Sequence, residues 1–121
     1  MKDVRQTVTL TVEYAIGEQR APRGPFEGGV DAPKYFNELY FGVFEDIVGD
    51  GPSGKTQINL WGSRRAYREF ARYLLALTAY SKDRRLRDPD YHDHFDNARN
   101  NEDEPLIHLI VHAPRSHRAG Q

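Results

Sequence analysis

The chain has 121 residues, no cysteine and a formal net charge of −1, with 38% hydrophobic and 29% charged residues. This length predicts a single domain, residues 1–121, because it suffices for one hydrophobic core but not for two substantial ones. The lack of cysteine excludes disulfides, thiol nucleophiles and thiolate metal sites. The near-zero charge argues against a nucleic-acid partner, and no apolar run is long enough to span a membrane. We therefore expect a cytoplasmic protein that binds neither.

The first half of the chain predicts three strands. Residues 4–16 alternate between hydrophobic and polar side chains, as in a strand with one buried face. Residues 17–35 form an expected long loop, because Gly and Pro recur there. Residues 36–48 are apolar on both alternations, which is typical of a central strand. A turn and a third strand, at residues 56–61, complete this half.

The second half predicts one helix and one strand. The helix is expected at about residues 63–81, where Ser63 can serve as N-cap and Tyr67, Phe70, Leu74 and Leu77 recur at helical spacing. Residues 82–105 are almost wholly polar and predict a second long loop. Residues 106–112 alternate as a strand, and residues 113–121 are expected to be a flexible tail.

These elements predict an α+β fold with a four-stranded, mostly antiparallel sheet, in the chain order β-β-β-α-β. One helix would cover one sheet face, which would carry Val8, Leu10, Val12, Ile58, Leu60, Ile107, Leu109 and Val111. The opposite face would show Trp61, His108 and His112, with whichever of Tyr40 or Phe41 points that way. That face is either packed under the long loops or an interface, for a second copy or another protein.

Residues 49–56, GDGPSGKT, satisfy the pattern G-x-x-x-x-G-K-T of a phosphate-binding loop. In such loops a helix begins at the motif and its amides point at the phosphates. Here residues 57–61 alternate like a strand, and Pro52 removes one amide. We therefore interpret the segment as a hairpin turn and expect no cofactor.

A second candidate is the run DYHDHFD, which offers His92, His94 and Asp96 as metal ligands, joined by His108 or His112. Zn²⁺ accepts histidine nitrogens and carboxylate oxygens. His92 and His94 can face one way only if this stretch is extended, and His108 and His112 stand too far apart along a strand to share one ion. The alternative is a solvated loop.

A third candidate is the stripe Arg64, Arg68 and Arg72, at spacing i, i+4 and i+8, with Arg65 beside its start. Cations in the first turn oppose the helix dipole, so local helix stability does not explain them. An anionic partner would. The alternative is that the stripe faces water or the acidic run 88–104.

The stretch LWGSRRAYREFARYLLALTAY, the histidine-bearing polar segment after it and LIHLIV resemble the helix-centred pattern of small immunity proteins of bacterial toxin systems, the family numbered thirty-two. The resemblance covers roughly half the chain and depends on Gly62, Leu74, Leu77 and the strand after the helix. It implies a protein that neutralises a toxin by contact, without cofactor or reaction.

The leading functional prediction is a non-enzymatic protein-binding module, because no catalytic constellation is evident. Its expected partner-binding residues are Tyr40, Trp61, Arg64, Arg65, Arg68, His108 and His112. The alternative is a small enzyme or ligand-binding domain with a histidine and aspartate site, in which arginines hold an anion.

Overall fold

The computed structural model describes residues 3–16, 29–83, 90–100 and 107–114, with the backbone alone for 96–100. Along the chain lie a 3-10 turn and five regular elements: η1 (Phe36–Glu38), β1 (Leu39–Val48), β2 (Gly51–Gly62), α1 (Arg64–Lys82), β3 (His92–Asn100) and β4 (Ile107–His112). The order is β-β-α-β-β. The predicted α+β class is confirmed, and the predicted order β-β-β-α-β is wrong.

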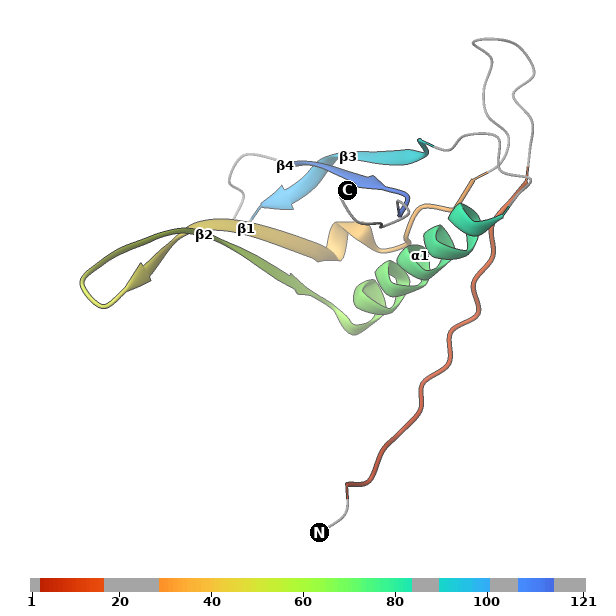
Figure 1. Cartoon of the computed structure of the whole chain (residues 1–121), viewed down its shortest axis with the longest axis horizontal. Helices are drawn as coiled ribbons and strands as arrows, with labels where there is room; N and C mark the ends of the chain where they lie inside the picture. The colour runs from red at the N-terminus through yellow and green to blue at the C-terminus, as the bar shows by residue number, and fades with distance from the viewer. Residues whose placement is uncertain (1–2, 17–28, 84–89, 101–106, 115–121) are drawn as a thin grey trace, which may run out of the picture.

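The strands form two antiparallel pairs, each a two-stranded sheet (Figure 1). Strands β1 and β2 pair from Leu39 with Gly62 to Val48 with Gly51. Strands β3 and β4 form the second pair. Within the described residues, β1 and β3 meet through a parallel register of two residues, which gives the spatial order β2-β1-β3-β4. The expected four-stranded, mostly antiparallel sheet is therefore right in its antiparallel pairing, but the strands form two two-stranded sheets instead of one continuous sheet under the helix.

The predicted hairpin turn at the glycine-rich motif is confirmed. β1 and β2 are joined by Gly49 and Asp50, and Gly49 has φ 63°, a conformation that glycine adopts without strain. β2 begins at Gly51, so the rest of the motif is strand. No helix N-terminus follows it, and the motif has no phosphate-binding geometry.

The predicted N-terminal strand is wrong, although its alternation of burial is partly right. Residues 3–14 have no strand partner among the described residues, and a single bridge joins Ala15 to Gly29. Leu10, Val12 and Tyr14 are nevertheless half-buried, while their odd-numbered neighbours are exposed. The period of two marks an extended segment that forms no strand pairing with the described residues, and only its last part, from Leu10 to Tyr14, places alternate side chains against the domain.

The predicted loop 82–105 contains strand β3, and is corrected accordingly. Its sequence HDHFDNARN is rich in residues that are depleted in strands, so propensity alone disfavours this assignment. The strand forms because Phe95 is buried and stacks on Phe36, with ring centroids 4.6 Å apart. Ala113, the expected first residue of the tail, is also buried, and its N–H donates to the Tyr91 carbonyl. Residues 17–28, 84–89, 101–106 and 115–121 lie outside the described residues.

The predicted helix is confirmed as α1, and the Ser63 Oγ accepts the Ala66 N–H at 3.1 Å as its N-cap. Its buried face carries Ala66, Tyr73, Ala76, Leu77 and Tyr80. Tyr67 and Leu74 were expected on that face but are 46% and 41% exposed. The described residues include no helix long and apolar enough to cross a membrane.

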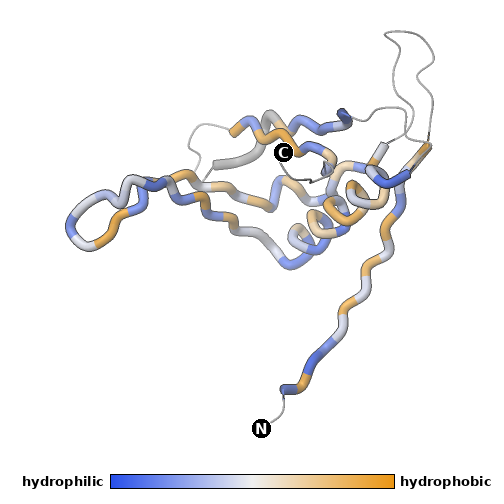
Figure 2. The backbone as a smooth tube through the Cα atoms, in the orientation of Figure 1, coloured by the Kyte–Doolittle hydropathy of each residue, from blue (hydrophilic) through white to orange (hydrophobic). Residues whose placement is uncertain are grey.

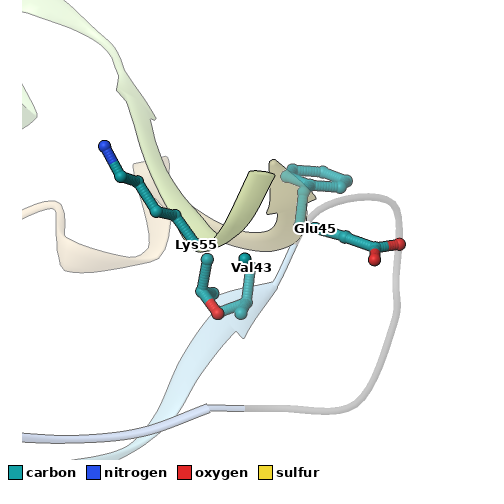
Figure 3. Close-up of a pocket in the computed structure, with 6 residues that line it drawn as sticks. Val43, Glu45 and Lys55 are labelled. Atoms are coloured by element: carbon teal, nitrogen blue, oxygen red, sulfur yellow. The ribbon is translucent and has the colours of Figure 1, made fainter. Parts of the chain in front are cut away.

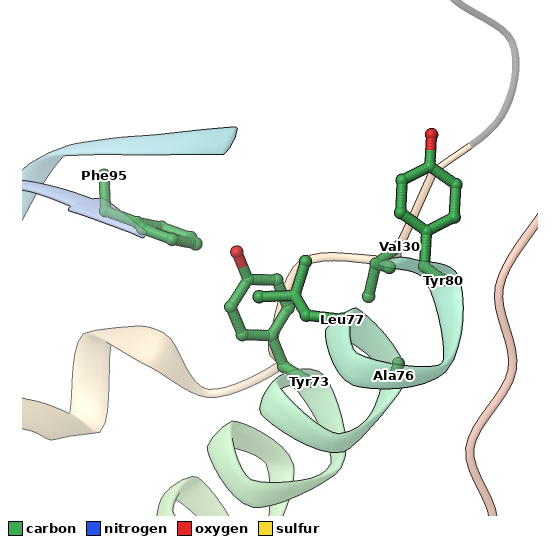
Figure 4. Packing of buried hydrophobic residues seen from close by; sticks show 6 residues of the cluster. All are labelled: Val30, Tyr73, Ala76, Leu77, Tyr80 and Phe95. Carbon is green, nitrogen blue, oxygen red and sulfur yellow. The ribbon is translucent and has the colours of Figure 1, made fainter. Parts of the chain in front are cut away.

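The core lies between α1, the β3–β4 pair and the segment that precedes β1 (Figure 4). Tyr73 packs edge-on to Phe95 and donates its hydroxyl to the Asp93 carboxylate at 2.5 Å. Burial and that carboxylate raise the pKa of Tyr73 far above its ordinary value, so the phenol stays protonated. Val12, Leu109 and Val111 border this core as expected. Val8 and Ile58 do not, because each is 74% exposed.

Candidate functional site

The β1–β2 hairpin projects away from the helix and the core (Figure 1). Hydrophobic and polar residues alternate along it (Figure 2). Seven of its large hydrophobic side chains are between 40% and 74% exposed, which makes this hairpin the main concentration of uncovered apolar surface among the described strands. They are Val43, Phe44, Ile47, Val48, Ile58, Leu60 and Trp61. Contiguous apolar surface of this kind marks interaction sites more often than idle surface.

Three aromatic residues lie on one face of this hairpin, here called the aromatic platform: Tyr40, Phe44 and Trp61. Tyr40 stands directly opposite Trp61 in the strand register. Phe44 lies two positions farther along β1 on the same face. Its ring meets the indole edge-on, with centroids 6.4 Å apart.

Gly42 makes room for the platform, because it lies between Tyr40 and Phe44 on the same face. A methyl group added at Gly42 would lie 2.5 Å from the Phe44 ring and 2.9 Å from the Trp61 ring. The two rings therefore close over the glycine backbone. Both rings are exposed at the surface, 40% for Phe44 and 44% for Trp61, and they contact each other edge-on.

The opposite face of the hairpin is aliphatic. Val43 is paired with Ile58, and Leu60 follows two residues later on the same side. At the outer end of the hairpin, an open hollow is lined by Val43, Phe44, Glu45, Gly54, Lys55 and Thr56 (Figure 3). The charged ends of Glu45 and Lys55 extend away from each other in this view. The hollow gathers no set of convergent polar groups.

A polar junction fixes the base of the hairpin to the start of α1. The Ser63 hydroxyl donates to Glu38 at 2.5 Å, and Arg65 donates to both oxygens of the same carboxylate. These hydrogen bonds lower the pKa of Glu38 to about 2, and the bond from Arg65 has the largest effect. The Arg65 guanidinium also lies 4.1 Å from the centre of the Tyr35 ring. Arg65, expected to contact a partner, is thus engaged within the chain.

The other arginines of the helical stripe differ in the contacts that they make within the chain. Arg72 binds Glu69 and donates to the Asp31 and Ala32 carbonyls. Arg68 donates to the Thr9 carbonyl. Arg64 is exposed and makes no hydrogen bond or ion pair with the residues that the structure describes. Intramolecular contacts therefore account for most of the stripe. The partners of Arg68 and Arg72 among the described residues do not belong to the acidic run 88–104.

Four histidines line the solvent face of the β3–β4 pair, here called the histidine row: His92, His94, His108 and His112. His92 stands opposite His112, and the ring centroids are 5.3 Å apart. His94 Nδ1 lies 3.0 Å from His108 Nε2. All four are exposed. His92 and His94 both belong to strand β3, which provides the extended conformation that lets the two side chains face one way.

Within the described part of the chain, no three His, Asp or Glu side chains are grouped closely enough to hold a metal ion as they stand. The side chain of Asp96, the third predicted ligand, lies outside the description. No described hydrogen bond or ion pair joins an arginine to the histidine row. The predicted pairing of histidines with an arginine-bound anion therefore has no geometric support among the described residues.

Sequence reasoning identified Tyr40 and Trp61 but missed Phe44 and Gly42. The signal was available in the spacing Tyr40-x-Gly42-x-Phe44, which places a glycine between two aromatics on one strand face. The pairing of His94 with His108 depends on the register of β3, which the polar composition of that strand concealed.

Comparison with known proteins gives no further assignment: no family model, no curated protein and no solved structure matches the chain.

Proposed function

We propose that the protein is a non-enzymatic protein-binding module whose partner docks on the aromatic platform. The observation that carries this proposal is the fixed pair Phe44 and Trp61, which is exposed on a projecting hairpin and closed over Gly42. Exposed aromatic rings without an intramolecular cover are the side chains that most often dominate protein interfaces.

The rigidity of the pair favours binding. A flexible side chain loses rotamer freedom when a partner immobilises it, at a cost of about 0.5–1.5 kcal/mol. Phe44 and Trp61 already restrain each other through their edge-on contact. The partner thus gains apolar contact at a reduced entropic cost.

The ionisable groups support binding over catalysis. The groups with a shifted pKa around the hairpin are held by structural partners: Glu38 by Arg65 and Ser63, and Asp46 by Ser53 and Gln57. These hydrogen bonds stabilise each carboxylate in its charged form.

The resemblance to immunity proteins implies that the partner is a bacterial toxin. Arg64 follows the platform by three residues and is exposed, so an acidic group on the partner's rim is the expected complement. A second copy of the chain is the competing occupant.

The test is site-specific photo-crosslinking in a lysate of the native cells. A benzophenone amino acid replaces Phe44 in one variant and Leu75 in the control, because Leu75 is 47% exposed on α1, away from the hairpin. We expect one protein to be trapped at position 44, absent at position 75, and to bind the purified chain directly. A band at twice the mass of the chain would identify a second copy. Equal trapping at both positions would reject the platform.

A further inference from the structure

The strand register brings His92 and His112 unusually close. The Ala113 N–H donates to the Tyr91 carbonyl at 2.9 Å, which makes residues 91 and 113 a hydrogen-bonded pair. In an antiparallel ladder hydrogen-bonded and non-hydrogen-bonded pairs alternate. His92 and His112 therefore form a non-hydrogen-bonded pair, the type in which facing side chains approach most closely.

His94 and His108 approach even more closely across the diagonal. His94 stands opposite Ile110, so His108, two residues before Ile110 in β4, lies on the same face. Their nearest nitrogens are 3.0 Å apart. With Zn–N bonds of about 2.0–2.1 Å at a tetrahedral angle, two imidazoles on one ion have their nitrogens about 3.3–3.4 Å apart. A metal can thus bind both nitrogens once the rings separate by a few tenths of an ångström and turn so that both lone pairs point at the ion.

The position of His92 beside this pair adds a further donor. Its ring centroid lies 4.9 Å from that of His94. His92 Nδ1 lies 2.8 Å from the Asp90 carbonyl oxygen, which only accepts hydrogen bonds, so Nδ1 carries the proton. The lone pair of the neutral ring is then on Nε2. Histidine ligands of metals are commonly oriented by such a bond from the other ring nitrogen to a carbonyl.

We propose that the histidine row binds one divalent transition-metal ion, held by His94 Nδ1 and His108 Nε2, with His92 as the nearest additional donor and water in the remaining positions. Imidazole ligands select Zn²⁺, Ni²⁺ and Cu²⁺ over Mg²⁺ and Ca²⁺, which prefer oxygen. The ion links β3 to β4, so it stabilises the folded state. The site is independent of the aromatic platform, which lies on the other strand pair.

The test uses the whole, chelator-treated chain with ZnCl₂ or NiCl₂, and with MgCl₂ as the oxygen-preferring control. We expect calorimetry to give one Zn²⁺ per chain and the thermal midpoint to rise by several degrees, without a shift from Mg²⁺. Copper bound to the same site should show nitrogen couplings from two or more imidazoles in its electron paramagnetic resonance spectrum.

Variants locate the ion. His94→Ala and His108→Ala should each weaken Zn²⁺ binding about tenfold or more, as loss of a ligand does, and His92→Ala should have a smaller effect. His117→Gln is the control, because it removes the fifth histidine of the sequence, which is not a member of the histidine row. The folding of all four variants can be checked by far-ultraviolet circular dichroism. Unchanged Zn²⁺ affinity in the folded His94→Ala, His108→Ala double variant would overturn the site, as would an equal loss in His117→Gln.

Discussion

Replacing Gly42 by alanine should disturb the aromatic platform while leaving the fold intact. The new methyl group would lie 2.5 Å from the Phe44 ring and 2.9 Å from the Trp61 ring. The Phe44 ring must retreat by about 0.9 Å to reach the 3.4 Å of an ordinary contact, and the Trp61 ring by about 0.5 Å. Both are outer ends of side chains, so they can swing away from the backbone.

The energetic balance at Gly42 is small. Separating the two rings costs about 0.5–1.5 kcal/mol, and replacing glycine within a strand returns about 0.5–1 kcal/mol through lower chain entropy. The free energy of unfolding should therefore fall by no more than about 1 kcal/mol. Binding should suffer more, with an affinity about tenfold lower, because the preorganised surface is lost.

Trp61 is the only tryptophan in the sequence, so its fluorescence reports the platform directly. Gly42→Ala should change the emission spectrum and acrylamide quenching of Trp61 with an unchanged far-ultraviolet spectrum. Gly51→Ala is the matched control on the same hairpin, because no atom lies within 4 Å of its added methyl group. Identical Trp61 emission in the wild type and Gly42→Ala would refute the idea that glycine seats the two rings.

Two further predictions concern the junction at the base of the hairpin. Ser63→Ala removes both the cap of α1 and a hydrogen bond to Glu38, so urea unfolding should show a loss of about 1–2 kcal/mol, and Ser81→Ala, near the other end of α1, should show less. Because the pKa of Glu38 falls from an ordinary 4.5 to about 2 in the folded chain, its contribution to stability is fully present above pH 4.5 and is lost as the pH falls toward 2. The difference in thermal midpoint between wild type and Glu38→Gln should accordingly shrink over that interval, and a constant difference would contradict the assigned role of Glu38.

The elements that could be predicted from sequence are those whose local signals agree with their environment. Ser63 and the apolar spacing of α1 gave the helix to within a residue, since cap and periodicity reinforce each other. Alternation alone left open whether Tyr40 or Phe41 shares a face with Trp61, and the register of β1 with β2, in which Tyr40 stands opposite Trp61, decides it.

Strand β3 could not be predicted, because tertiary contacts override its composition. A run of His, Asp and Asn has low strand propensity, and Phe95 anchors this run through its stacking on Phe36. The prediction for the N-terminal segment was wrong in the opposite sense, because a strand was expected and the described residues form none there. Its alternation has the period of a strand, yet periodicity records which side is buried and does not supply a pairing partner.

The most direct test of protein binding through the aromatic platform is the affinity of Trp61→Ala for the protein trapped at position 44. Binding measured by calorimetry should weaken by about 30-fold or more, the effect of losing an interface residue worth about 2 kcal/mol. Leu75→Ala, which truncates a side chain of comparable exposed fraction on α1, should bind as the wild type does. Equal affinities for Trp61→Ala and the wild type, with both chains folded, would contradict the proposal that a partner docks on Tyr40, Phe44 and Trp61.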